Sequence, residues 1–220
     1  MLHVLDEAYK ETRRVLEGLA ETKPPYKALI EWIGQQPGGE NVLNVVYWMC
    51  ARSRPCLTVV FERQSDVIRF AGNDIGSREL NGSIITKFRE ILIEQRNTKI
   101  VTEDIFVILA AFAEVERAVA NGKVPPEAVF AFQHSLADPS IWLMQPRGGV
   151  LRVFFHTDAQ LAASEQSGIR GKIAKGYQAV VAPYDEFGYV REEPIEPLFD
   201  SRERFERDYQ GSWQGYYHDN

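Results

Sequence analysis

The sequence has few of the residues that cross-link a protein, bind metals or anchor it in a membrane. It contains two cysteines, Cys50 and Cys56, so a disulfide framework is excluded and we expect two reduced, half-buried thiols. Its four histidines form no HxH or HExxH pair, so we expect no metal and no cofactor. The longest apolar run, residues 105–113, has nine residues. A bilayer span needs about 20, so we expect no membrane segment.

The chain also lacks a signature of catalysis. No GxSxG, P-loop or dinucleotide-binding fingerprint is present, and we assign no catalytic residue. The first 20 residues carry charges throughout and have no apolar core of a signal peptide, which predicts a cytoplasmic protein. With 220 residues, 45% hydrophobic and 25% charged, the composition is that of a globular protein. We expect a single domain over residues 1–220, with a subdivision near residues 121–126 as the alternative.

Negative charge is concentrated at the carboxyl end. Residues 185–220 hold 10 acidic and 4 basic side chains, whereas the rest of the chain is balanced at 21 of each. The same segment holds 8 of the 25 aromatic residues. An acidic, aromatic segment favours a cationic partner, because complementary charge speeds association and aromatic rings dominate interface energies. A solvated tail whose aromatic rings pack back on the domain is the alternative.

Hydrophobic periodicity in the first half predicts both helices and strands. We expect helices over residues 2–19, 26–33 and 83–96, a strand over 41–50, and a hairpin of strands 56–62 and 67–71. Residues 72–82 read as a polar loop, with Ser83 capping the helix that follows. Residues 105–113 are apolar nearly all round and follow Thr102, an N-cap residue, so they predict a central buried helix that stops at Asn121.

The second half predicts a second hairpin and shorter helices. The hairpin strands are residues 140–144 and 150–156, joined by a glycine-containing turn. Thr157 and Gln160 have the spacing of a capping box for a helix through Ser164. We expect a loop over 166–176, a strand over 177–182 paired with 188–191, and a helix over 201–209. Strand–strand–helix order favours an α+β fold with a mostly antiparallel sheet. The two hairpin-and-helix units do not align well enough to predict an internal repeat.

One glycine-rich segment offers a candidate anion site. Residues 168–176 contain three glycines with Arg170, Lys172 and Lys175, which would neutralise a phosphate. No Ser or Thr follows a Gly-Lys pair, so the segment is not a P-loop. A flexible connection is the simpler interpretation.

Residues 138–194 resemble part of the SseB family of small bacterial α+β proteins. The resemblance rests on Ile141-Trp142-Leu143, the glycine turn, the run from Val153 to Leu161, and the apolar residues 179–183 that end in Pro183. His156 interrupts the Phe-Thr pair that the family pattern has, and Ala182 stands where that pattern has Asn. The family has no established catalytic site, so the resemblance implies a fold and carries over no functional residue.

Together these features favour a non-enzymatic bacterial protein that binds another protein, in its sharpest form an immunity protein or inhibitor that docks a basic partner. The candidate partner-binding residues all lie in the acidic segment and are Asp185, Glu186, Glu192, Glu193, Phe205, Trp213, Tyr216 and Tyr217. We expect no nucleic acid and no membrane among its partners, and the sequence leaves the oligomeric state open. The alternatives are an enzyme of small molecules or nucleotides that uses residues 168–176, and an oligomerising module that uses the apolar stripe of the first helix.

Overall fold

A computed structural model describes residues 2–3, 6–50, 54–72 and 78–219 of the chain. The described residues form an α+β protein in two compact units, residues 1–115 and 116–220. The boundary falls between Val115 and Glu116, a few residues before the subdivision that the sequence offers as its alternative. Among the described residues, no helix combines the length and the apolar character that a membrane crossing requires.

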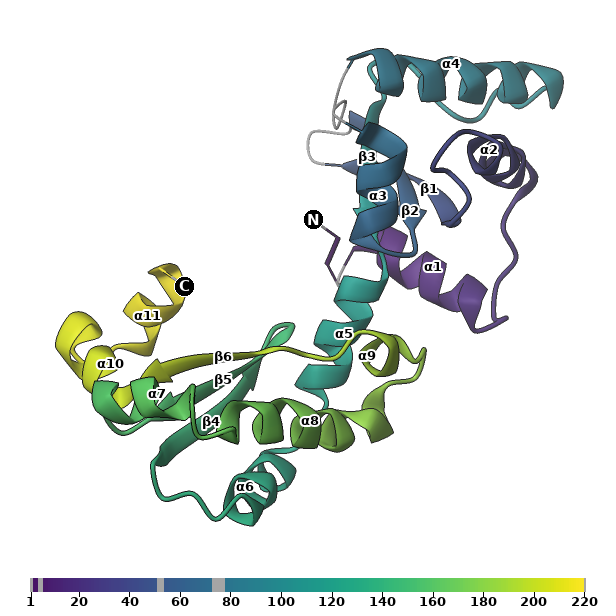
Figure 1. The fold of residues 1–220 in the computed structure, drawn as a ribbon. Coiled ribbons are helices and arrows are strands. Elements are labelled where there is room, and N and C mark those ends of the chain that lie inside the picture. The colour runs from purple at the N-terminus through teal and green to yellow at the C-terminus, as the bar shows by residue number, and fades with distance from the viewer. Residues whose placement is uncertain (1, 4–5, 51–53, 73–77, 220) are drawn as a thin grey trace. The chain divides into compact units, whose positions relative to one another are not determined.

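The first unit is a three-stranded sheet with helices on both faces. Its elements are α1 (Glu7–Leu16), α2 (Pro24–Gly34), β1 (Val42–Cys50), β2 (Arg54–Phe61), α3 (Gln64–Ala71), α4 (Arg78–Glu94), β3 (Phe106–Ala111) and the first residues of α5 (Ala113–Gly122) (Figure 1). The strand order is β1-β2-β3, with β1 antiparallel and β3 parallel to β2. Leu29 of α2, Phe88 of α4 and Leu57 of β2 meet in the core. Asn44 of β1 donates to the Thr12 hydroxyl of α1 at 3.4 Å, so α1 covers the opposite face.

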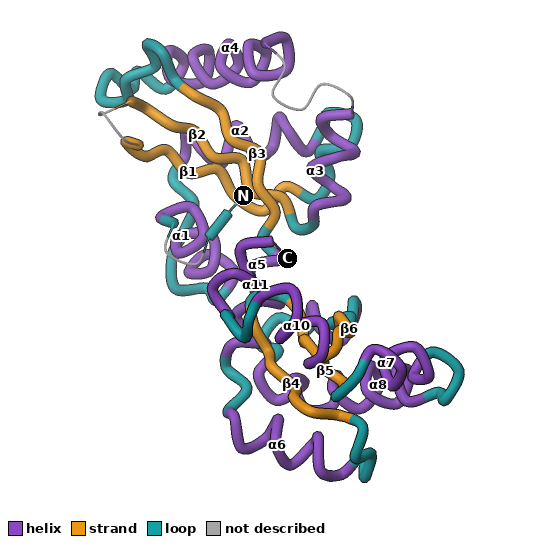
Figure 2. Tube along the Cα trace, turned by 90° about the vertical axis from the view of Figure 1, so that its left-hand side faces the viewer, coloured by secondary structure: helices purple, strands orange, loops and turns teal. Residues whose placement is uncertain are grey.

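The second unit repeats this plan. Its elements are the rest of α5, α6 (Pro126–Ser135), β4 (Ile141–Arg147), β5 (Val150–Phe155), α7 (Asp158–Ser164), α8 (Ile169–Val181), the 3-10 helix Ala182–Tyr184, α9 (Tyr189–Glu192), β6 (Pro197–Ser201), α10 (Arg202–Tyr209) and α11 (Trp213–Asp219). The order is β4-β5-β6, again with an antiparallel hairpin and a parallel third strand; Figure 2 shows the three strands of each unit side by side. Ile173 and Tyr177 of α8 pack on Val153 and Phe155 of β5.

The two units correspond in detail, which the sequence analysis did not predict. Each hairpin carries a bulge at the same place: Val42 pairs with Phe61 before one bulge, and Ile141 pairs with Phe155 before the other. The next helix of each unit begins three residues past a strand that ends in phenylalanine. Its third residue, Asp66 in α3 or Gln160 in α7, accepts a hydrogen bond from the backbone N–H of the N-cap residue at 3.0 and 3.1 Å. The chain therefore contains an internal structural repeat.

Each sheet mixes antiparallel and parallel pairing, so the expectation of a mostly antiparallel sheet is met only in part. The run 105–113 is not a buried helix but the parallel strand β3, followed by α5 from Ala113. Such a strand is surrounded by protein on both faces, so its residues do not alternate in polarity. Periodicity alone does not distinguish it from a buried helix.

Residues 67–71 were also assigned wrongly. They lie in α3, and β2 pairs with β1 instead of with them. The helix expected from Ser83 begins at Arg78, and residues 73–77 of the preceding segment lie outside the described residues. The helix expected over residues 2–19 is shorter, covering Glu7–Leu16. Leu5 of its expected apolar stripe lies outside the described residues, and Leu16 is exposed.

The expected loop at 166–176 and strand at 177–182 are one helix, α8, and residues 189–192 form α9. Two glycines, Gly171 and Gly176, lie inside α8, and a glycine in a helix costs about 1 kcal/mol, which is why the segment resembles a loop. Gly176 has a packing reason: a Cβ there would lie 2.5 Å from the Phe132 ring.

The remaining local signals are confirmed. Helix α2 and strand β1 form where expected, and the second hairpin is β4–β5. Gln160 N–H donates to the Thr157 hydroxyl at 3.2 Å, which completes the capping box of α7. Ser201 caps α10, accepting from Arg204 N–H at 2.9 Å. At these two helices a Thr or Ser side chain accepts from an amide of the first turn, and the sequence located both helix starts correctly.

Candidate binding site

The residues proposed for anion binding do not converge. On α8, Arg170 does not share a face with Lys172 or Lys175, which are three positions apart and neighbours. The Arg170 guanidinium donates to the Ser164 hydroxyl at 2.7 Å and pairs with Glu165 at 3.3 Å. Lys172 and Lys175 are exposed. The glycine loop that was to wrap a phosphate is therefore absent, and Arg170 holds α7 to α8 instead.

The acidic residues at the start of the carboxyl-terminal segment are held by neighbours. The Asp185 carboxylate accepts from the backbone N–H groups of Val190 and Arg191 at 3.1 and 3.0 Å, which fixes the start of α9. Glu186 forms an ion pair with Lys123. Glu193 pairs with Arg117 at 3.0 Å, and Glu192 is exposed. These carboxylates stabilise the local fold, which reduces the charge that they offer to a partner.

The acidic residues of β6 and α10 are paired in the same way. Arg204 lies 3.5 Å from the Asp200 carboxylate, and Arg202 pairs with Glu206 at 2.7 Å. Arg207 bridges two carboxylates, Asp158 and Asp208, at 2.8 Å each. Its hydrogen bond lowers the pKa of Asp158, with a second contribution from the Ser201 hydroxyl. Five of the ten acidic residues in 185–220 thus have an ion-pair partner, although residues 116–220 keep 15 acidic against 11 basic side chains.

Two of the four aromatic candidates are part of a core. Phe205 and Tyr216 are 3% and 4% exposed and pack against Phe154 on the outer face of the second sheet. The Tyr216 hydroxyl donates to the Asp200 carboxylate at 2.8 Å, and burial, followed by that carboxylate, raises the pKa of Tyr216. Neither residue offers its ring to a partner.

The other two aromatic candidates form a half-exposed stack with a third ring. Trp142, Trp213 and Tyr217 are each partly buried. Trp142 stacks on Trp213 with ring centroids 6.3 Å apart and planes 7° apart, and Trp213 stacks on Tyr217 at 5.7 Å and 22°. Arg202 lies over the Trp142 ring at 5.0 Å, and Arg147 lies over the Tyr217 ring at 3.8 Å. We call these five residues the aromatic ladder.

The bulge of β4 explains how the ladder forms. Ile141 and Met144 face the inner core, whereas Trp142 and Leu143, around the bulge, both belong to the outer cluster. A bulge redirects side chains in this way. Figure 1 shows α10 and α11 (yellow) following β6 directly, which brings Trp213 and Tyr217 to the same face. Sequence analysis missed Trp142, Arg147 and Arg202, because local patterns do not reveal which rings stack across 70 residues.

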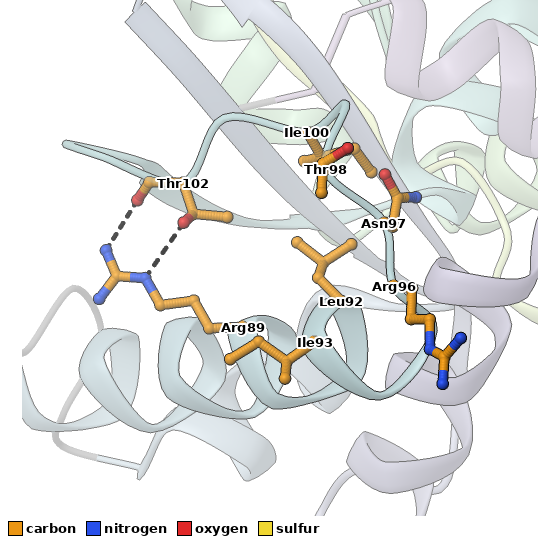
Figure 3. A pocket seen from close by; sticks show the side chains of 8 residues that line it. All are labelled: Arg89, Leu92, Ile93, Arg96, Asn97, Thr98, Ile100 and Thr102. Carbon is orange, nitrogen blue, oxygen red and sulfur yellow. Dashed lines mark hydrogen bonds between the residues drawn. The ribbon is translucent and has the colours of Figure 1, made fainter.

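A groove in the first unit has no acid–base group among its lining residues. It measures about 510 Å³ and runs between α4 and residues 97–102 (Figure 3). Its lining consists of Arg89, Leu92, Ile93, Arg96, Asn97, Thr98, Ile100 and Thr102. Within the part of the chain that the structure describes, no three histidine, cysteine or acidic residues are grouped so as to hold a metal ion.

Comparison of the chain with protein families, with curated proteins and with solved structures finds no match.

Proposed function

We propose that this protein acts by binding another protein, and that the aromatic ladder is its docking surface. The observation that carries the proposal is the stack of three half-exposed rings with an arginine over each end. Tryptophan, tyrosine and arginine are the residues that most often dominate binding energy at protein interfaces. The inhibitor or immunity role that the sequence favours is one form of this proposal.

The ladder is preorganised for binding. Trp213 rests on buried Phe205, with centroids 4.2 Å apart, and the Tyr217 hydroxyl hydrogen-bonds the Gln145 side chain. Rings that are already ordered lose little conformational entropy when a partner covers them. Most of the free energy gained when a partner covers the rings would therefore contribute to affinity.

The charge around the ladder favours a partner different from the one expected. A basic partner was inferred from the surplus carboxylates of residues 185–220, of which those nearest the ladder, Asp200 and Glu206, are paired with arginines. Arg147, by contrast, is exposed, and no carboxylate among the described residues lies within ion-pair distance of it. We therefore propose a partner that covers the rings with an apolar side chain and places a carboxylate beside Arg147.

The proposal is tested by affinity capture from the native host with the full chain and three variants. Trp213→Ala removes the central ring and Arg147→Glu reverses the charge at one end. Phe130→Ala is the control, because Phe130 is a ring 62% exposed on α6, outside the ladder. We expect wild type and Phe130→Ala to retain the same specific partner and both ladder variants to lose it, with at least about a tenfold weaker affinity for the purified partner.

Arg147→Glu is the ladder variant that should fold as the wild type does, because this side chain is exposed at the end of β4. Its circular dichroism spectrum and melting temperature should match those of the wild type. Retention of the partner by both folded ladder variants would refute the docking surface. Failure of the wild-type chain to retain any specific partner would refute the binding role itself.

A further inference from the structure

The groove of the first unit combines an apolar floor with cationic ends. Leu92, Ile93 and Ile100 contribute the apolar surface, and the Ile93 side chain is 77% exposed. Figure 3 shows Arg89 and Arg96 toward opposite ends of the groove. Arg89 lies on α4, and Arg96 follows seven positions later, two residues past the last residue of that helix. None of the eight lining residues is acidic.

The Arg89 side chain is held by hydrogen bonds, whereas the position of Arg96 is set by the backbone conformation at the end of α4. The Nε and Nη2 atoms of Arg89 donate to the Thr102 hydroxyl at 3.3 Å and to the Thr102 carbonyl at 2.8 Å, which leaves Nη1 for a ligand. Arg96 follows the end of α4 with a φ of 52°. Its N–H donates to the Ile93 carbonyl at 3.0 Å, and that of Asn97 donates to the Leu92 carbonyl at 2.8 Å. This is a Schellman motif with arginine at the position where glycine is usual.

We propose that this groove binds an acidic amphipathic helix of a partner protein, with carboxylates seven residues apart and two apolar side chains between them. Such a helix places its two carboxylates about 10 Å apart on one face, one toward each cationic end of the groove. The apolar residues three and four positions after the first carboxylate lie on the same face and would cover Ile93 and Leu92. The site lies in a different unit from the aromatic ladder and does not depend on it.

The charge of the groove disfavours a second copy of this chain as its occupant. In a symmetric dimer the same surface meets itself, so Arg89 and Arg96 of one copy would face the same cations of the other. Like charges across an interface oppose association. Glu90, on the same helix, is held by Lys87 at 3.0 Å and, like Glu94 and Glu103, does not line the groove.

The test measures binding of a labelled helical peptide to the full chain by fluorescence anisotropy. The peptide has 14 residues, with Glu at positions 4 and 11, Leu at positions 7 and 8, and helix-forming Ala and Gln elsewhere. In the control peptide, Lys replaces both glutamates. We expect the Glu peptide to bind at least about tenfold more tightly than the Lys peptide, and the difference to shrink as salt screens the charges.

Arg96→Gly is the decisive variant, because glycine adopts a positive φ without strain. The variant should melt no lower than the wild type and yet bind the Glu peptide roughly tenfold more weakly. Lys172→Ala is the matched control: it removes one positive charge from an exposed position in the other unit and should leave binding unchanged.

Three outcomes would overturn the proposal. The first is equal binding of the Glu and Lys peptides, and the second is unchanged affinity in folded Arg96→Gly. The third is evidence for another occupant of the groove. This would be dodecanoate that binds and depends on Arg96 while the Glu peptide does not bind, or dimerisation of the chain, measured by light scattering, that Arg96→Gly abolishes.

Discussion

Glu203, in the first turn of α10, accepts a hydrogen bond from the backbone N–H of Asp158 at 3.0 Å, which ties α10 to the first amide of α7. The first unit has the same contact: Glu114, in the first turn of α5, accepts from the backbone N–H of Gln64 at 2.9 Å. In both units a glutamate after the third strand satisfies an otherwise unpaired amide at the start of the helix that follows the hairpin. A charge-assisted bond of this kind also complements the helix dipole.

Removing either glutamate should destabilise its own unit. For Glu114→Ala and Glu203→Ala we expect losses in the free energy of unfolding of about 1–2 and about 0.5–1 kcal/mol, the smaller loss at Glu203 because its side chain is exposed whereas that of Glu114 is partly buried. Urea denaturation followed by circular dichroism measures both. Glu196→Ala is the control, since Glu196 is exposed and takes part in none of these contacts. Equal stability of all four proteins would show that the repeated contact contributes nothing.

A buried hydrogen bond between Tyr177 and Asn121 should contribute more to the free energy of unfolding than the two glutamate contacts. The Tyr177 hydroxyl donates to Asn121 Oδ1 at 2.8 Å, and Asn121 Nδ2 donates to the carbonyls of Gly148 and Val150, each at 2.9 Å. Tyr177→Phe leaves Asn121 Oδ1 buried without its donor, so we expect a loss of about 1–3 kcal/mol in the free energy of unfolding. Tyr184→Phe removes a half-exposed hydroxyl and should change stability by less than about 0.5 kcal/mol. A loss no larger than that of the control would contradict the role of the contact.

The aromatic core under the ladder should depend on Phe205. This ring packs against Phe154 and Trp213, with centroids 6.1 and 4.2 Å away. Phe205→Ala should therefore lower the free energy of unfolding by about 3–5 kcal/mol and shift tryptophan emission to longer wavelength, because Trp213 loses the ring on which it rests. Phe130→Ala, which removes an exposed ring, should do neither. An unshifted emission maximum in a folded Phe205→Ala variant would show that the ladder does not need this support.

The elements that the sequence predicted correctly have their cause within a few residues. Thr157 and Gln160 cap α7 by direct hydrogen bonds, and Ser201 caps α10. By contrast, residues 106–111 become a strand because β2 lies beside them, paired from Cys56 to Phe61. That partner lies 50 residues away, so no local pattern contains it.

The candidate site was predicted only in part for the same reason. Composition identified the aromatic and acidic segment, including Trp213 and Tyr217. It did not reveal that Arg207 pairs with both Asp158 and Asp208, or that the bulge beside Ile141 turns Trp142 outward. Charge counts along a chain do not distinguish a free carboxylate from one that a neighbouring helix pairs. The repeat was missed because the hairpins and capping positions correspond in structure while their residue types differ.

The buried thiol of the first hairpin predicts a pH dependence. Cys56 is 1% exposed, and burial, together with the neighbouring Cys50 thiol, raises the pKa of Cys56 from 9.0 to about 11. Between these values the unfolded chain releases the proton while the folded chain keeps it, so the free energy of unfolding should fall as pH rises from about 9 to about 11. Since the thiolate is the reactive form, native Cys56 should resist iodoacetamide at pH 8, whereas unfolded chain should be alkylated. Unfolding curves of wild type and Cys56→Ala across this range isolate the thiol, because every other titrating group is common to both; parallel curves would show that its pKa is not raised.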